Sequence, residues 1–418
     1  MNSFIKESDF FKGNNIEEIA RQYGTPLYVY NEDILVEKMH DVRDTITKYP
    51  YQCNYSIKAN SNLELLKIAL REGLSCDAMS EGELRLLMKA GFPKDRIFFV
   101  PNNIDENEMQ FAIDNDILTS LDSIDQLEMF GRLNPGGRCA VRINPGVGAG
   151  HHDKVVTAGK NTKFAISMED VDEIFVVAKK YDLKVIGINQ HVGSLYMTPE
   201  PFLEAVDNLI EVAGKFGKLE FIDFGGGYGI PYHKLDDEPP FDFKSFSIEF
   251  TKKLDYFVEK YGYTPLFKSE PGRYVVAECG VILGRVNATK ENAGKIYAGT
   301  DVGMNVLARP TLYDSFHDIE IVRNGEVIGK AEASSFEKVT VTGNICESGD
   351  VLCKERLLPK IEDNDLICVL DAGAYGYSMC YPYNQRLRPA EIMIMHDGSV
   401  KLVRRRETFE DLFAYFVE

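Results

Sequence analysis

Eight short runs with the pattern of β-strands alternate with amphipathic helical stretches between about Tyr51 and Val275. The strand candidates are YQCNYSIK, LSCDAMS, RIFFVPNN, ILTSLDS, RCAVRINP, LKVIGINQHV, LEFIDFGGG and TPLFKSEPG. Helical patterns such as LELLKIALREG and SEGELRLLMKAG lie between them, and several stop at a glycine, as helix C-termini often do. Eight β-α units at this spacing predict an α/β fold with a (β/α)8 TIM-type barrel; a doubly wound open sheet is the alternative.

The alternation of strand and helix patterns ends at about Gly280. Short β-rich runs such as VILGRV, KVTVTGNICESGD and EIMIMHDGSVKLV follow, separated by Gly, Asn and Asp turn signals, and they favour a mostly antiparallel C-terminal β domain. The strand candidate PLYVY precedes the barrel and is able to pair with that domain. We predict a barrel over residues 34–279 and a β-rich domain made of residues 1–33 and 280–418. The stretch KLDDEPPFD, residues 234–242, is expected to be a solvated loop.

Charge and cysteine usage restrict the partners and the compartment. The formal charge is −18, from 47 Lys plus Arg against 65 Asp plus Glu, and such a field repels nucleic acid and anionic membranes. The eight cysteines have no CxxC spacing, which suits a reducing compartment. No run of 18 apolar residues and no apolar leader segment occurs. We therefore expect a cytoplasmic protein with no nucleic-acid and no membrane partner.

Polar residues stand where the predicted strands end. The carboxyl ends of the strands carry the active site in barrels of this type, so these residues are expected to meet at one mouth. They are Lys58, Asp77, Asn102, Arg142, His191, the run Gly225, Gly226 and Gly227, and Glu270 with Arg273.

Lys58 ends a strand that otherwise resembles core. In NYSIKAN, Tyr55 and Ile57 alternate with Asn54 and Ser56, which predicts a half-buried strand. A lysine in a partly desolvated site loses pKa and becomes a nucleophile that forms Schiff bases. The simpler interpretation is an ion-paired or snorkelling lysine.

The run DFGGGYGI follows a strand and precedes a helix. Successive glycines there are able to present backbone N–H groups to a phosphate. The dinucleotide spacing GxGxxG fails, because a pattern started at Gly225 meets Ile230, so a monophosphate is the better interpretation. A tight turn that needs positive φ is the alternative.

Two further motifs complete a possible cofactor site. In SEPGR, Glu270 is able to bond a ring nitrogen and Arg273 to grip a carboxylate or phosphate, although an ion pair at a turn is the simpler interpretation. In QHVGS, small neighbours leave room for a flat ring on His191, which is otherwise a core histidine. No HxH or HExxH spacing suggests a metal site. A lysine, a phosphate cradle and a carboxylate for a pyridine nitrogen together indicate pyridoxal 5'-phosphate, with Lys58 as its attachment residue.

The chain resembles the pyridoxal-phosphate decarboxylases of alanine-racemase fold, and among these the diaminopimelate decarboxylases. The motifs that carry the resemblance are YSIKAN, CDAMSEGEL, QHVGS, FGGGYGI, SEPGR, RPTLYDSFH, CESGDVL and AGAYGYSM...YNQRLRPAE, in that order over nearly the whole chain.

The resemblance implies roles for individual residues. Lys58 would hold pyridoxal 5'-phosphate as a Schiff base, His191 would stack on its ring, and Glu270 would pair with the ring nitrogen. The other cofactor-binding positions are Asp77, Glu83, Arg142, Ser194, Gly225, Gly226, Gly227, Pro271, Gly272, Arg273 and Tyr375. The positions that bind substrate are Arg273, Arg309, Tyr313, Glu347 and Tyr375, and Cys346 matches the proton donor.

The resemblance also implies an activity and an assembly. The expected enzyme is a decarboxylase that converts meso-2,6-diaminopimelate to L-lysine and CO2, as a homodimer whose CES segment, residues 346–348, reaches into the partner's barrel. The β domain would thus contribute to the active site and to the dimer interface. Arg309 would fork onto the distal carboxylate of the substrate, and Glu347 would bind the distal ammonium.

Two alternatives stay open. The segment at residues 146–166 differs from the version expected in many diaminopimelate decarboxylases, with His151 and His152 side by side and Ala165 where glycine is common. A sister decarboxylase for D-ornithine, D-lysine or a related diamino acid is the first alternative. A non-enzymatic pyridoxal-phosphate-binding protein is the second, although a carrier needs no proton donor such as Cys346.

Overall fold

The described chain forms two compact units. The structure is a computed structural model that describes residues 1–150, 157–159 and 162–417. One unit, the barrel unit, consists of Val36–Ile230 and Pro240–Val275. The other, the β unit, consists of Met1–Leu35, Pro231–Pro239 and Val276–Glu418.

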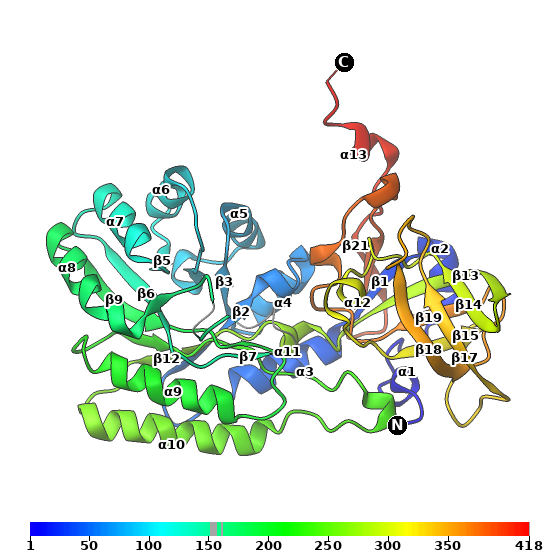
Figure 1. The fold of residues 1–418 in the computed structure, drawn as a ribbon, viewed down its shortest axis with the longest axis horizontal. Helices are drawn as coiled ribbons and strands as arrows, with labels where there is room; N and C mark the ends of the chain where they lie inside the picture. The colour runs from blue at the N-terminus through cyan, green and yellow to red at the C-terminus, as the bar shows by residue number, and fades with distance from the viewer. Residues whose placement is uncertain (151–156, 160–161, 418) are drawn as a thin grey trace. The chain divides into compact units, whose positions relative to one another are not determined.

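The barrel unit contains a closed ring of eight parallel strands (Figure 1). In order around the ring they are β2 (Tyr51–Ser56), β3 (Ser75–Ala78), β4 (Ile97–Phe99), β5 (Leu118–Leu121), β6 (Arg138–Asn144), β9 (Lys184–Asn189), β11 (Phe221–Asp223) and β12 (Leu266–Ser269). The ring has no open edge, because β12 pairs with β2 and β5 pairs with β6. The predicted barrel is confirmed, and the open sheet is wrong.

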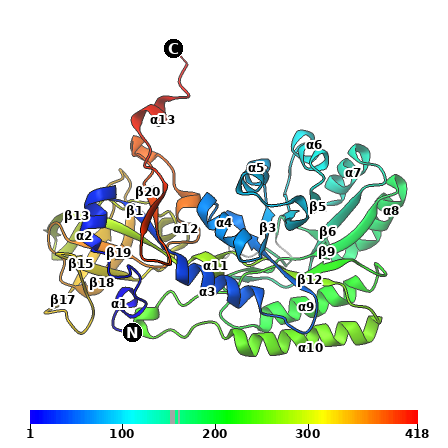
Figure 2. The same cartoon turned by 180° about the vertical axis from the view of Figure 1, so that it is seen from behind.

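Helices alternate with the strands along the chain and lie outside the ring, as Figures 1 and 2 show. They are α3 (Glu32–Arg43), α4 (Leu63–Arg71), α5 (Glu81–Ala90), α6 (Glu106–Asp114), α7 (Ile124–Leu133), α8 (Val171–Tyr181), α9 (Glu200–Ala213), α10 (Phe243–Tyr261) and α11 (Arg273–Val276). The two-residue strands β7 (Ala149–Gly150), β8 (Ile166–Ser167) and β10 (Gly193–Ser194) lie in loops after barrel strands.

The helices begin and end where local chemistry predicts. Ser80 and Ser123 accept backbone N–H groups at the starts of α5 and α7, which satisfies donors that have no partner inside the helix. Gly91 and Gly262 end α5 and α10 with φ of 96° and 69°, a conformation that costs glycine little.

Strand β2 is buried on both faces, so the prediction of a half-buried strand is wrong. Asn54 and Ser56 are 0% and 2% exposed, as deeply buried as Tyr55. A barrel strand has one face against the helices and the other inside the ring, so neither face meets solvent. The polar alternation of the sequence therefore places polar groups inside the barrel.

The β unit is a ten-stranded, mostly antiparallel sheet. Its strands are β1 (Leu27–Asn31), β13 (Gly280–Asn292), β14 (Lys295–Thr300), β15 (Ile319–Arg323), β16 (Glu326–Ile328), β17 (Phe336–Thr342), β18 (Val351–Pro359), β19 (Leu366–Val369), β20 (Ala390–Ile394) and β21 (Val400–Arg404). Its helices are α1 (Phe4–Glu7), α2 (Ile16–Tyr23), α12 (Arg309–Tyr313) and α13 (Phe409–Phe413). The N-terminal β1 lies between β13 and β20, so the pairing expected for PLYVY is confirmed (Figure 2).

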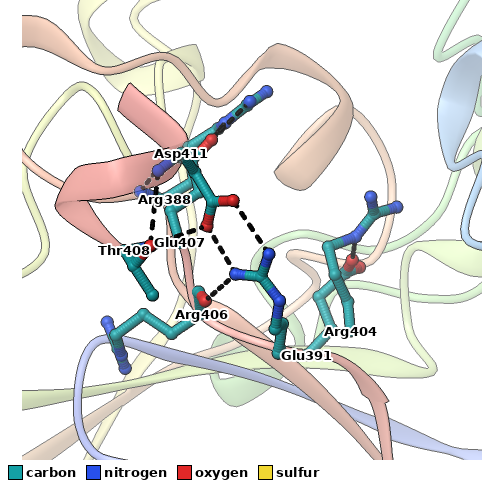
Figure 3. A network of polar contacts seen from close by, with 8 residues as sticks. Arg388, Glu391, Arg404, Arg406, Glu407, Thr408 and Asp411 are labelled. Carbon is teal, nitrogen blue, oxygen red and sulfur yellow. Dashed lines mark hydrogen bonds and ion pairs between the residues drawn. The ribbon is translucent and has the colours of Figure 1, made fainter. Parts of the chain in front are cut away.

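Charged pairs fasten the C-terminal segment to this sheet (Figure 3). The buried carboxylate of Glu391 accepts from the Tyr30 hydroxyl at 2.6 Å and also bonds Arg404. Arg388 donates through Nε to Glu407 at 2.6 Å. Thr408 and Asp411 then form a capping box at the start of α13. These contacts fix where α13 begins.

The segment expected to be a solvated loop is partly buried. Lys234 is 4% exposed, and its Nζ lies 2.7 Å from Glu278 Oε1 and 2.7 Å from Asp371 Oδ1. Asp236 and Asp237, which are exposed, gave the stretch its polar appearance. The expectation was wrong because two acids distant in the sequence supply a partner for the lysine.

Candidate active site

The ends of β2 and β12 are tied together directly. Ser56 donates through its backbone N–H to the Pro271 carbonyl at 3.0 Å and through Oγ to the Glu270 carbonyl at 3.1 Å. A Cβ on Gly272 would stand 3.1 Å from the Cβ of Ser56. The turn SEPGR thus packs against the short 3-10 helix Ile57–Ala59 that carries Lys58.

Two acids interact electrostatically with Lys58. Asp77, at the end of β3, is 1% exposed, and burial raises the pKa of its carboxyl while Lys58 and Arg142 oppose the rise. Burial likewise raises the pKa of Glu83, and Lys58 again opposes it. Glu83 is held in place because it accepts the Met79 N–H at 2.7 Å. Both acids therefore sense the charge of Lys58.

Glu270 is a buried acid with an unused oxygen. The residue is 5% exposed, and its Oε1 has no hydrogen-bond partner among the described residues. Burial raises its pKa well above the usual value, and the charges of Asp223 and Asp77 add to the effect. A buried carboxyl of this kind can share a proton with a basic ring nitrogen.

Arg142 brings a compensating charge from β6. It is 5% exposed, and burial lowers its pKa while Glu270, Asp122 and Asp77 oppose the change. Its guanidinium carbon lies 4.9 Å from the centre of the Phe164 ring, and its Nε has no partner within the described chain. The arginine therefore stands between acids of three strands.

The glycines after β11 leave no space for side chains. A Cβ on Gly226 would come within 2.1 Å of the Glu270 carbonyl oxygen, and one on Gly227 within 2.4 Å of the Gly193 carbonyl oxygen. Gly225 and Gly227 have φ of 75° and 115°, which other residues rarely adopt. The run DFGGGYGI thus forms a bare backbone cradle.

Polar groups from two other strand ends meet this cradle. Arg273 donates through Nε and Nη2 to Ser194 Oγ at 3.2 and 3.1 Å. The Gly226 N–H donates to His191 Nδ1 at 3.4 Å. Burial lowers the pKa of His191 well below its usual value, with Lys58 and Arg142 adding to it, so the imidazole is neutral and able to accept. Cradle, serine and arginine together suit an anion.

Sequence reasoning missed Asp223, which shapes the cradle. Its Oδ1 accepts the Gly225 N–H at 2.9 Å, and its Oδ2 accepts Asn54 Nδ2 at 3.1 Å. Burial raises its pKa to about 7. The signal was present in DFGGGYGI, where an acid at a buried strand end stands two residues before the first glycine. Lys268 was also missed; it is 7% exposed, and its Nζ lies 4.2 Å from the centre of the Phe221 ring.

The remaining predicted residues lie in the β unit. Arg309 opens α12 and is 1% exposed. Cys346 is exposed, and its N–H donates to Asn384 Oδ1 at 2.8 Å; Glu347 accepts from the Tyr383 hydroxyl at 2.6 Å. The other residues of this group are the half-buried Tyr313 and Tyr375. Their participation in the site stays a prediction. Asn102 bonds Asp122 in the barrel unit.

The unusual segment at residues 146–166 is described in part. His151 and His152 lie outside the described residues. Ala165 has φ of 71°, a left-handed conformation that suits the glycine common there in the resembling family. Within the described residues, no three His, Cys, Asp or Glu side chains group to hold a metal ion. In the same part of the chain, no helix has the length and apolar character that crossing a membrane requires.

Comparison with known proteins identifies the family. The family described as "Pyridoxal-dependent decarboxylase, pyridoxal binding domain" matches residues 32–277. A diaminopimelate decarboxylase of Methanothermobacter thermautotrophicus is 39% identical over 96% of this chain and 93% of its own. The crystal structure of diaminopimelate decarboxylase from Helicobacter pylori complexed with L-lysine has a TM-score of 0.87 and 29% identity, covering 96% of this chain and 98% of that one.

A more distant structure shares the fold. It is the lysine/ornithine decarboxylase of Vibrio vulnificus complexed with cadaverine, with a TM-score of 0.79, 20% identity and coverage of 95% of this chain and 99% of that chain. Family match and full-length relatives agree with the geometry of the barrel mouth. The chain therefore belongs to the pyridoxal-dependent decarboxylase family, among the diaminopimelate decarboxylases.

Proposed function

We propose that the protein decarboxylates meso-2,6-diaminopimelate to L-lysine with pyridoxal phosphate as its cofactor. The observation that carries the proposal is the buried Glu270 carboxyl, whose Oε1 has no partner among the described residues, beside the turn that carries Lys58. The diaminopimelate decarboxylase relatives, 32–39% identical over nearly their whole length, support the choice of substrate.

The barrel mouth fits the cofactor. Gly225, Gly226 and Gly227 with Ser194 would hold its phosphate, because a glycine run and a serine hydroxyl bonded to Arg273 suit an anion. Glu270 would bond the ring nitrogen, and His191 would lie against the ring. Lys58 would supply the amine that binds the aldehyde carbon. When bound, pyridoxal phosphate supplies an electron sink for the electron pair that CO2 leaves behind.

The chain's own groups would direct the chemistry. Glu270 would bond the ring nitrogen and keep it protonated, because a carboxylate beside the nitrogen stabilises its charged form. Asp77 and Glu83 would hold the Lys58 amine in place once the substrate amine has taken its position on the cofactor. After CO2 departs, Cys346 would donate a proton to the substrate carbon, and Lys58 would then release the product.

The distal end of the substrate would be held by the β unit. Arg309, Tyr313, Glu347 and Tyr375 are the proposed contacts, with Arg309 on the distal carboxylate and Glu347 on the distal ammonium. Arg273 is proposed to contact substrate from the barrel unit. An arginine fork matches a carboxylate, whereas ornithine or lysine decarboxylated at its only carboxylate offers Arg309 no anion.

Arg309→Ala is expected to raise KM for meso-diaminopimelate by roughly 10²-fold, because removing one partner of a buried charge pair leaves the other unpaired. CO2 release from D-ornithine and D-lysine is measured alongside. Arg323→Ala is the matched control, since Arg323 pairs with Asp365 in the same unit at 2.7 Å. Turnover of D-ornithine or D-lysine alone by the unaltered enzyme would instead favour the sister decarboxylase. No turnover of any amino acid would favour a cofactor-binding protein.

We also propose a cytoplasmic homodimer with shared active sites. The cysteines are all free, which suits a reducing compartment. Cys346 is exposed, and its loop would reach the partner's barrel.

Mixing Lys58→Ala and Cys346→Ala subunits tests the shared site. Each variant alone is expected to be inactive, whereas the mixture should recover up to about a quarter of the unaltered activity, since half the dimers then hold one intact site. The measurement is CO2 release after the subunits have exchanged. No recovery, with exchange verified by mass, would show that each site uses residues of one chain.

A further inference from the structure

Arg309 is held by a histidine and a tyrosine of its own unit. Its Nη1 lies 2.7 Å from His317 Nε2, and its guanidinium carbon lies 4.8 Å from the centre of the Tyr232 ring. The arginine is 1% exposed. One contact is a hydrogen bond to the guanidinium and the other places the guanidinium over the Tyr232 ring, so together they restrict where the group lies.

The tautomer of His317 follows from its two partners. His317 is 2% exposed, and its Nδ1 lies 2.7 Å from the Leu370 carbonyl oxygen. A carbonyl oxygen only accepts, so Nδ1 carries the proton and donates it. A guanidinium only donates, so Nε2 must be the acceptor. The ring is therefore neutral and protonated at Nδ1, which is the one form that satisfies both neighbours.

The ring is itself held from several sides. Tyr232 meets it edge to face, with ring centres 5.3 Å apart and an angle of 77°. Arg356 donates to the backbone carbonyl of His317, and its guanidinium carbon lies 3.9 Å from the centre of the Phe316 ring. His317 thus has little freedom to turn away from Arg309.

We propose that His317 is the positioning residue that orients Arg309 toward the distal carboxylate of the substrate. This inference rests on the proposed function, in which Arg309 reads that carboxylate. An arginine that is already fixed before the ligand binds loses little conformational entropy when it bonds a carboxylate. The resulting gain in affinity applies only to ligands that carry a carboxylate. His317 would thereby contribute to specificity without touching the substrate.

Two substitutions separate the contacts of the ring. The amide nitrogen of asparagine stands about where Nδ1 stands, so His317→Asn keeps the donor to Leu370 and loses the acceptor for Arg309. The amide oxygen of glutamine stands about where Nε2 stands, so His317→Gln keeps the acceptor for Arg309. If the role of His317 were purely structural, both substitutions would disturb it.

The readout is ligand binding to the holoenzyme. L-lysine, the proposed product, keeps the distal carboxylate, and cadaverine lacks it. We expect His317→Asn to weaken L-lysine binding by roughly 10- to 100-fold, as expected for a lost hydrogen bond to a charged group, and to leave cadaverine binding within about 3-fold. His317→Gln should stay within about 3-fold for both ligands. KM for meso-diaminopimelate should rise in His317→Asn with little change in kcat.

Controls separate the possible failures. His396→Asn removes a histidine whose side chain is 86% exposed, and it should change neither affinity. Equal losses in the Asn and Gln variants, or none in either, would overturn the role of His317 while the proposed function stands. Equal binding of L-lysine and cadaverine by the unaltered enzyme would instead refute the distal-carboxylate subsite. If His317→Asn does not fold, Tyr232→Leu is tested instead, because Tyr232 contacts both His317 and Arg309. Equal weakening of L-lysine binding and cadaverine binding in that variant would overturn the proposal.

Discussion

Lys58→Ala is expected to abolish covalent attachment of pyridoxal phosphate and to lower decarboxylation by roughly 10³-fold or more, because no other amine replaces the lost nucleophile. Borohydride reduction of the holoenzyme followed by peptide mass analysis measures the attachment directly. The expected label lies on the peptide that contains Lys58 and is missing from the variant. The surrounding acids support this position, since Asp77 and Glu83 both sense the charge of Lys58.

Lys268 provides a matched control in the same barrel. It too is a buried lysine, at 7% exposure, but its ammonium lies over the rings of Phe98 and Phe221. Lys268→Met should therefore keep the label on the Lys58 peptide. A label that persists in Lys58→Ala would mean that the attachment residue has been misassigned.

Glu270→Gln is expected to lower kcat by about 10²- to 10³-fold, because an amide cannot share a proton with the ring nitrogen as the carboxyl does. The size of the side chain is preserved, so the loss reports proton chemistry and not packing. Cofactor content is measured on the same sample to separate weak binding from slow reaction. Unchanged kcat with full cofactor content would refute the assigned role.

Glu270 is also expected to make the free energy of unfolding of the cofactor-free protein depend on pH. Burial raises the pKa of Glu270, so above the ordinary pKa of about 4.3 the unfolded chain loses this proton while the folded chain keeps it. The free energy of unfolding therefore falls as pH rises toward the raised pKa. Below about pH 4 both states hold the proton, so this contribution to the free energy of unfolding is fully present and no longer changes with pH. Glu270→Gln should flatten this fall in a series of thermal unfolding curves, and an unaltered slope would contradict the raised pKa.

Local patterns in the sequence were enough to predict the eight strands of the barrel. Each of the eight strands falls within its predicted run, because strand period, helix period and glycine stops are properties of adjacent residues. The β unit was predicted less completely: β18 went unpredicted, and Lys234 was placed in a solvated loop although it pairs with Glu278 and Asp371. Those partners are distant in sequence, and no local pattern connects them.

The sequence by itself determined which residue types stand at the strand ends, and the connection of parallel strands in a barrel brings those ends to one mouth. Only the tertiary structure decided their protonation states and contacts. Ser56 reaches Glu270 across 214 residues of chain, and Asp223 reaches Asn54 across 169. The neutral His191, the raised pKa of Glu270 and the pKa of about 7 at Asp223 all follow from burial beside such distant neighbours. Desolvation depends on which groups surround a charge in space, and that information exists only once the chain has folded.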